Sequence, residues 1–235
     1  MKLPLIATLL CNACFTTAHY TFAIISHNDG PLSDPWTYIR NVTTGWAFSE
    51  DNINNYEPYY DLYDDNVRCG RGAATRPAHK TLSVNAGDRL AFFATQRDHN
   101  MVERLVGVYH EGPGQAYLSR APHDDLDRYT GDGDWFKIGS ITTKSDSKWA
   151  LTEMPSSCGT DRWLEMNFTI PKTTPPGKYL MRVEQLFPLV PRFNNTQFYI
   201  GCAQLDIKGL GGGTPGPMVK FPGEYSIWDP CGYSS

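Results

Sequence analysis

The chain has 235 residues, of which 21 are Lys or Arg and 25 are Asp or Glu, so its formal net charge is −4 at pH 7. An acidic chain is poorly suited to neutralising phosphates, and nucleic acid is therefore excluded as a partner class. The sequence contains 21 Gly, 17 Pro, 13 Tyr and 11 Phe, a composition that favours short strands and turns over long helices. We expect an all-β fold in one domain, because β-sandwiches of roughly 200 to 250 residues often remain undivided.

The first 18 residues have the pattern of a secretory signal peptide. Lys2 gives a basic start, residues 3–15 are mostly apolar, and small residues lead to Ala18. The apolar run is shorter than the about 20 residues that a membrane-spanning helix needs. We therefore predict a signal peptide over 1–18, a secreted, extracellular protein with no membrane partner, and a single mature domain over 19–235.

Periodicity and turn residues predict a series of strands in the mature chain. Strands are expected over residues 20–25, 81–84, 89–95, 105–109, 163–170, 177–184 and 197–205. Residues 85–88 form a turn between the second and third of these. Residues 41–66 have no sustained period and predict a long surface loop region. The glycine-rich residues 211–217 predict a flexible surface connection.

The cysteines and glycosylation signals agree with secretion. Two of the six cysteines leave with the predicted signal peptide, and the four that remain are Cys69, Cys158, Cys202 and Cys231. An even number in a secreted chain favours two disulfides over a thiolate metal site, and three pairings are possible. Sequons for N-glycosylation occur at Asn41, Asn167 and Asn194.

Cleavage after Ala18 makes His19 the first residue of the mature chain. Its free α-amine and its imidazole Nδ1 can then chelate one metal ion, and imidazole suits copper, zinc, iron and nickel. The alternative is that cleavage falls a residue or two away, which leaves His19 as an ordinary residue near a terminus.

A second histidine and a tyrosine are further candidates for a metal site. His110 follows an expected strand and opens a sharp turn, although a lone histidine there is more often structural or solvated. Gln197 and Tyr199 alternate on an expected strand, so their side chains face the same side. If that side faces His19 and His110, an amide and a phenol border the metal; a half-buried aromatic strand is the plainer interpretation. The other histidines are expected in exposed loops, at His27, His79, His99 and His123.

Clustered carboxylates offer a rival interpretation as the acid and base of a glycosidase. The candidates are Asp124, Asp125, Asp127, Asp132 and Asp134. Loop aspartates of this kind are more often solvated turn formers or a calcium site, and neighbours in sequence seldom provide two opposed carboxyl groups. The common hydrolase motifs, a Gly-x-Ser-x-Gly elbow and a His-Glu-x-x-His helix, are missing.

Taken together, these motifs make the chain similar to the fungal lytic polysaccharide monooxygenases of auxiliary-activity family 9, once classed as glycoside hydrolase family 61. The similarity runs through nearly all of the mature chain. Its first part is His-Tyr-Thr-Phe at 19–22, Val-Arg-Cys at 67–69, His-Glu-Gly-Pro at 110–113 and the segments 117–122 and 133–138. It continues through 170–171, 176–184, 197–199, 202–204, 222–225 and 229–230.

The resemblance implies an immunoglobulin-like or fibronectin-like antiparallel β-sandwich with long loops, whose flat face carries one copper ion. Copper would be bound by the amine and Nδ1 of His19, by His110, and axially by Tyr199. Gln197 would position the oxygen species near the metal. The resemblance also implies a disulfide between Cys69 and Cys202, which leaves Cys158 and Cys231 for a second bridge.

The resemblance further implies the activity and its partners. The reaction is oxidation at carbon 1 or carbon 4 of cellulose or a related β-1,4-glucan, driven by an external electron donor and by O2 or H2O2. Tyr20 and Tyr225 are expected to stack on sugar rings as surface tyrosines. We expect the protein to be a monomer.

Two departures from the family pattern touch the oxygen chemistry. The histidine that family members usually carry about eleven residues before the axial tyrosine falls at or beside Pro188 here, and only Arg192 nearby offers a cation. Glu111 replaces the usual proline after the second histidine. The first hypothesis is therefore a copper monooxygenase, and the alternative is a secreted copper-binding protein of the same fold with weak or no oxidative activity.

Overall fold

The structure is a computed structural model. It describes residues 19–42, 56–98, 100, 102–108, 110–145, 148–151, 165–188 and 195–228. The predicted signal peptide lies outside the described residues, as do His99, Cys158, Arg192, Asn194 and Cys231. None of the helices among the described residues is long and apolar enough to cross a membrane.

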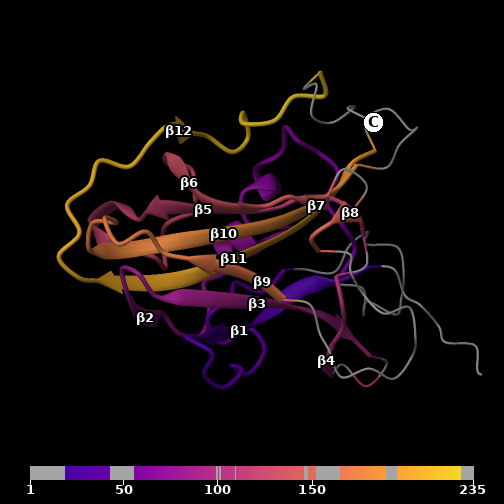
Figure 1. The fold of residues 1–235 in the computed structure, drawn as a ribbon, viewed down its shortest axis with the longest axis horizontal. Helices are drawn as coiled ribbons and strands as arrows, with labels where there is room; N and C mark the ends of the chain where they lie inside the picture. The colour runs from indigo at the N-terminus through magenta and orange to yellow at the C-terminus, as the bar shows by residue number, and fades with distance from the viewer. Residues whose placement is uncertain are drawn as a thin grey trace, which may run out of the picture.

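Two sheets lie face to face and make up most of the described chain (Figure 1). The first sheet contains β1 (Thr21–His27), β3 (Arg89–Arg97), β4 (Glu103–Leu105) and β9 (Glu165–Thr169). The second has the order β12 (Met218–Val219), β6 (Trp135–Ile141), β5 (Gly114–Arg120), β10 (Gly177–Phe187), β11 (Gln197–Lys208) and β2 (Leu82–Asn85). A small ribbon pairs β7 (Thr143–Ser145) with β8 (Lys148–Trp149).

In the part of the chain that the structure describes, the helical content is limited to three single turns of 3-10 helix. They are η1 (Asp65–Val67), η2 (Ala73–Thr75) and η3 (Pro122–Asp124). All strand pairs are antiparallel except β11 with β2, which is parallel. The prediction of an all-β, immunoglobulin-like sandwich is confirmed.

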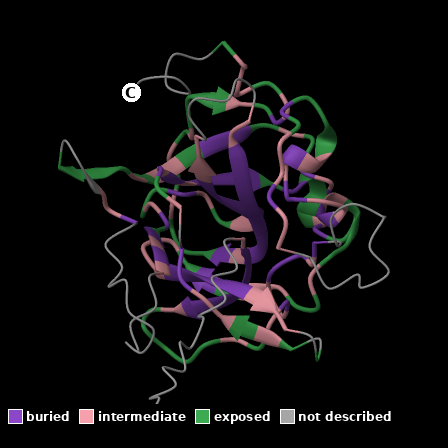
Figure 2. Cartoon of the chain, turned by 90° about the vertical axis from the view of Figure 1, so that its right-hand side faces the viewer, coloured by how far each residue is buried: buried purple, intermediate pink, exposed green. Residues whose placement is uncertain are grey.

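The core lies between the two sheets, where large side chains from both inner faces interdigitate. Figure 2 shows the buried residues along the central strands. Phe92 and Leu90 from β3 and Trp135, Leu180 and Leu205 from the second sheet are fully buried. Burying one such side chain contributes about 1.5 to 3 kcal/mol to folding, so this apolar layer is what fixes the strands that carry the functional residues.

The long strands predicted from the sequence are present, but one expectation needs correction. The two strands predicted around the turn at 85–88 are confirmed; they belong to different sheets, because β2 pairs with β11 whereas β3 pairs with β1, β4 and β9. The strand expected over 105–109 is wrong, since β4 ends at Leu105. Beyond Leu105 the chain crosses to the second sheet, where β5 begins at Gly114, so His110 precedes a strand instead of following one.

Candidate metal centre

Three aromatic side chains from distant parts of the chain converge at one place. His19 lies just before β1, His110 lies just before β5, and Tyr199 is the third residue of β11. The ring centroids are 6.2 Å apart for His19 and His110, 6.4 Å for His19 and Tyr199, and 5.5 Å for His110 and Tyr199. The structure therefore brings together the three residues that the sequence singled out as candidate ligands.

The strand β11 presents Tyr199 together with Gln197. Their side chains lie on one side of the strand, as the period of two requires, and the Tyr199 hydroxyl donates to Gln197 Oε1 over 2.6 Å. Gln197 Nε2 in turn donates to the Tyr60 hydroxyl over 3.1 Å. The same-face prediction is confirmed, and the Gln197 amide is held between two phenols.

Burial determines the protonation state of the phenol at this site. It raises the pKa of Tyr199 well above its ordinary value, and the nearby Tyr60 and Glu57 raise it further. Tyr199 is therefore a neutral hydroxyl over the whole physiological range. A neutral phenol is a weak oxygen donor, which suits a distant ligand position more than a short bond.

Tyr20 packs against the ring of Tyr199 at this site. Its ring stacks on Tyr199 with 4.1 Å between centroids and 17° between planes, and its hydroxyl donates to Gln185 Oε1. Gln185 Nε2 then donates to the backbone oxygen of His110 over 3.3 Å. A chain of contacts thus joins the start of β1 to the loop of His110 through β10.

The expectation that Tyr20 is a surface tyrosine is wrong. Tyr20 is 1% exposed, so neither face of its ring is available to a sugar. Tyr225 is half-buried, its hydroxyl donates to Glu184, and its ring packs 5.7 Å from that of Phe221. Tyr20 therefore belongs to the packed interior, whereas the stacking of a sugar on Tyr225 stays a prediction.

An apolar ring covers His110 where the family pattern would have a histidine nearby. Phe187, the last residue of β10, stacks on His110 with 4.2 Å between centroids and 7° between planes. Pro188 follows it in the chain. Phe187 therefore orients the imidazole by packing, and the Phe187 and Pro188 side chains carry no proton donor.

The loop of His110 depends on a glycine. Gly112 has φ of 148°, and a Cβ added there would lie 1.8 Å from the backbone oxygen of Leu186. The backbone amide of Leu186 donates to Pro113 O over 3.0 Å. The loop is thus fitted closely against the end of β10, and this fit holds His110 in place.

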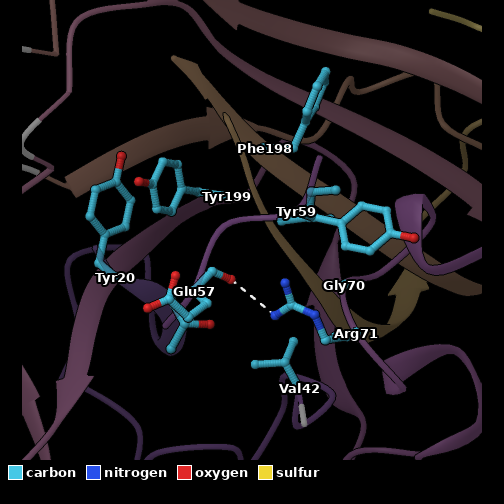
Figure 3. Close-up of a pocket in the computed structure, with 10 residues that line it drawn as sticks. Tyr20, Val42, Glu57, Tyr59, Gly70, Arg71, Phe198 and Tyr199 are labelled. Carbon is cyan, nitrogen blue, oxygen red and sulfur yellow. Dashed lines mark hydrogen bonds between the residues drawn. The ribbon is translucent and has the colours of Figure 1, made fainter. Parts of the chain in front are cut away.

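Glu57 is a member of the site that the sequence did not indicate. Its Oε2 lies 3.3 Å from His19 Nδ1. It falls within the long loop region predicted over 41–66, where no period or motif marks a functional carboxylate. Figure 3 shows Glu57 near Tyr20 and Tyr199, on the side of the pocket away from Phe198.

The donors assembled here fit a copper ion. Among the described residues no group of three or more His, Cys, Asp and Glu side chains forms a metal site. The side-chain donors that the structure brings together are two imidazoles and a phenol. Metal–imidazole bonds are about 2.0–2.1 Å long, so two imidazoles that would share one ion have ring centroids no more than roughly 6.5 Å apart. The 6.2 Å between His19 and His110 agrees with this, and nitrogen-rich sets suit copper.

The remaining candidates lie in other surroundings. Asp124 accepts from the Lys178 amide and Asp134 lies 3.4 Å from Lys220 Nζ; both are exposed, which supports turn and surface roles and not a glycosidase pair. His79 and His123 are exposed as expected, but the His27 prediction is wrong because it is half-buried in β1 and pairs with Asp88.

One disulfide lies close to the site. Cys69 and Cys202 are bonded across a sequence separation of 133 residues, as the resemblance implied. Cys202 follows Tyr199 by three positions on β11, and Cys69 follows η1. The bond therefore ties the loop region that contains Glu57 to the strand that presents Tyr199.

Comparisons with known proteins give the class of this site. The AA9 family lytic polysaccharide monooxygenase U of Thermothielavioides terrestris is 40% identical over 220 residues, which cover 91% of this chain and 79% of that protein. The AA9 family lytic polysaccharide monooxygenase H of Malbranchea cinnamomea is 37% identical over 227 residues, which cover 95% and 87%. The crystal structure of a cellulose-active polysaccharide monooxygenase from M. thermophila has the same fold, with a TM-score of 0.65 and 23% identity over 90% of this chain and 89% of that one.

The fold and the similar proteins define a lytic polysaccharide monooxygenase. The model of Auxiliary Activity family 9 (formerly GH61) matches residues 19–233. The chain belongs to this family.

Proposed function

We propose that this protein is a secreted, copper-dependent monooxygenase that oxidatively cleaves cellulose or related β-1,4-glucans from a mature chain beginning at His19. Family membership supports the reaction class, and the family match that begins at residue 19 supports cleavage after Ala18. The similar fold of a cellulose-active enzyme supports the substrate. The observation that carries the proposal is the convergence of His19, His110 and Tyr199.

Each residue of the site has a defined task in this proposal. The α-amine and Nδ1 of His19, a ring nitrogen of His110 and the hydroxyl of Tyr199 hold one copper ion. The ion supplies the one-electron chemistry by which a reductant and O2 or H2O2 oxidise carbon 1 or carbon 4 of the glucan. Gln197 orients the Tyr199 hydroxyl through the 2.6 Å hydrogen bond between them, and outer groups of this kind tune metal ligands.

The packing around the imidazole supports the role of His110 as a ligand. Phe187 fixes the ring plane of His110 and excludes water from that side. The alternative, a copper-binding protein that has lost oxidation, is not favoured because the similar proteins that cover most of the chain are monooxygenases. Glycosylation at Asn41, Asn167 and Asn194, a Cys158–Cys231 bond and the monomeric state remain predictions.

Product analysis tests the proposal. Mature protein with His19 at its terminus is loaded with one copper per chain and incubated with amorphous cellulose, ascorbate and H2O2, and the soluble products are examined by mass spectrometry. We expect oxidised oligosaccharides that vanish without copper and in the His110→Ala variant. Reducing-end products alone, independent of the reductant, would instead show hydrolysis and contradict the proposal.

A further inference from the structure

The two imidazoles that the proposed function assigns to copper belong to opposite sheets of the sandwich. His19 lies just before β1 in the first sheet, and His110 lies in the segment that leads into β5 in the second. Groups that act together at a site generally need to be held within about 0.5 Å of their working positions. A contact that joins the two sheets beside these histidines therefore bears directly on the metal site.

A buried glutamine on β10 makes such a contact. The side chain of Gln185 is fully buried, and its Oε1 accepts a hydrogen bond from the hydroxyl of Tyr20, the residue that follows His19. Its Nε2 donates to the backbone oxygen of His110 over 3.3 Å and to that of Leu186 over 2.6 Å. One amide is thus engaged with both of the segments that carry the histidines.

On the side of the first sheet, the contact reaches His19 through Tyr20. The Tyr20 ring is 1% exposed and stacks on Tyr199 with 4.1 Å between centroids (Figure 3). The His19 carbonyl accepts a hydrogen bond from Gln96 on β3. Residues 19 and 20 are therefore held by their rings and by their polar groups, so the position of the Tyr20 hydroxyl is coupled to that of the His19 backbone.

On the side of the second sheet, the loop of His110 packs closely over the same amide. A Cβ added to Gly112 would lie 3.1 Å from Gln185 Nε2, in addition to its clash with the Leu186 oxygen. The backbone amide of Leu186 donates to the Pro113 oxygen over 3.0 Å. Two consecutive residues of β10 thus hold the beginning and the end of the loop 110–113.

The partners at this position require an amide. They are a hydroxyl donor on one side and a carbonyl acceptor on the other, and a glutamine side chain both accepts and donates. An ionised carboxylate accepts without donating, and an aliphatic side chain does neither. Resting on the proposed function, we infer that Gln185 is a positioning residue that sets the separation of His19 and His110 around the copper ion.

The test measures copper binding and spectra, separately from activity. Mature wild-type protein is compared with Gln185→Met, which keeps an unbranched side chain of similar length and removes its amide, and with Tyr20→Phe, which removes the hydroxyl and keeps the stacked ring. The matched control is Gln204→Met on the neighbouring strand β11. Gln204 is 1% exposed, and its Oε1 accepts from the Arg40 side chain and the Ala78 backbone amide.

Two measurements report on the site and one on the fold. The Cu(II) affinity is measured by calorimetric competition and the Cu(II) environment by electron paramagnetic resonance. Circular dichroism melts of the copper-free proteins give the stability of each variant. Gln204→Met removes an equally buried amide, so it shows how much a loss of stability by itself changes copper binding.

We expect Gln185→Met to bind Cu(II) about tenfold more weakly than the wild type, at the lower end of the range for groups that support a metal site, and to give a shifted Cu(II) spectrum. Tyr20→Phe shifts the spectrum by less, because the hydrogen bond from Gln185 to the His110 oxygen is kept. The two effects overlap, so the double variant binds about as weakly as Gln185→Met. Gln204→Met melts at a lower temperature but keeps the wild-type spectrum and affinity.

A Gln185→Met protein that differs from the wild type in spectrum and affinity no more than Gln204→Met does would overturn the inference and leave the proposed monooxygenase intact. If Gln185→Met does not fold, Tyr20→Phe decides, and an unchanged spectrum in that variant overturns the inference. A wild-type protein that shows the Gln185 effects but yields no oxidised sugar supports the inference and refutes the proposed function. A wild-type protein that binds no copper overturns both.

Discussion

At the scale of single residues, aromatic packing helps to hold His110 and Tyr199. Phe187 stacks nearly parallel to the imidazole at 4.2 Å between centroids, and Tyr20 stacks in the same way on Tyr199. Stacked aromatic pairs contribute about 0.5 to 1.5 kcal/mol beyond the area that they bury. Two of the three proposed ligand rings are thereby fixed before any metal binds.

Replacing Phe187 by Ala removes the ring that orients His110. We expect the Cu(II) affinity to fall by about 10 to 100-fold, as is typical when a group supporting a ligand is lost. Isothermal titration of the copper-free protein with Cu(II) measures this. Phe187→Tyr keeps the stacked ring and should bind as the wild type does; equal affinity in Phe187→Ala would show that the stack has no part in the site.

At the scale of secondary structure, sequence patterns predicted the strands that carry the site better than the loops that complete it. The alternation of Gln197 and Tyr199 predicted correctly that their side chains lie on one face, because the period of two in a strand depends only on neighbouring residues. β5 was missed because polar residues interrupt its apolar pattern: Ser119 is buried there, satisfied by hydrogen bonds to Tyr129 and Asp134. Glu57 was missed because its place depends on Arg71 and β11, which are distant in the sequence.

The prediction that Tyr20 is exposed was wrong for a related reason. The local sequence does not distinguish an exposed from a buried aromatic residue near a terminus. Only the packing of β1 against β10 and β11 shows that Tyr20 is covered. The disulfide pairing likewise could not be chosen from the four cysteines alone, because it depends on which segments the fold brings together.

The His110 loop gives a prediction about the backbone. In Gly112→Ala the new Cβ would meet the Leu186 oxygen at 1.8 Å, at a φ of 148°. We expect a loss of at least about 1 to 3 kcal/mol in the free energy of unfolding, together with weaker copper binding as His110 moves.

Urea unfolding followed by circular dichroism measures this loss. Gly212→Ala is the matched control, because nothing lies within 4 Å of its added Cβ. A Gly112→Ala variant as stable as that control would refute the close fit of the loop against β10.

At the scale of the whole molecule, the core contains many tyrosines whose hydroxyls are buried in polar contacts. Burial raises the pKa of four of them above the ordinary value: Tyr20, Tyr117, Tyr199 and Tyr225. The charge of Glu184 raises the pKa of Tyr117 and Tyr225 further, and neighbouring tyrosines do the same for Tyr20 and Tyr199. Glu184 is fully buried and lies 2.7 Å from Arg182. The interior thus combines apolar packing with buried polar contacts among these tyrosines, Glu184 and Arg182.

These tyrosines predict how stability depends on pH. Because their pKa values are raised in the folded state, the unfolded chain loses phenol protons first, above about pH 10. The contribution of these tyrosines to the free energy of unfolding is fully present below that pH. It declines as the pH rises further, by about 1.4 kcal/mol per pH unit for each such tyrosine. Urea unfolding in a series of alkaline buffers should show this decline, and a flat profile through that range would contradict the account.

We expect processing at His19 to create the copper site. The most direct test compares two proteins, one beginning at His19 and one carrying a single additional alanine before it, in the yield of oxidised oligosaccharides from cellulose at equal copper. We expect abundant oxidised products from the first and a loss of about 100-fold in the second, because the α-amine is no longer a ligand. Equal yields from the two proteins would show that the terminal amine has no part in the site.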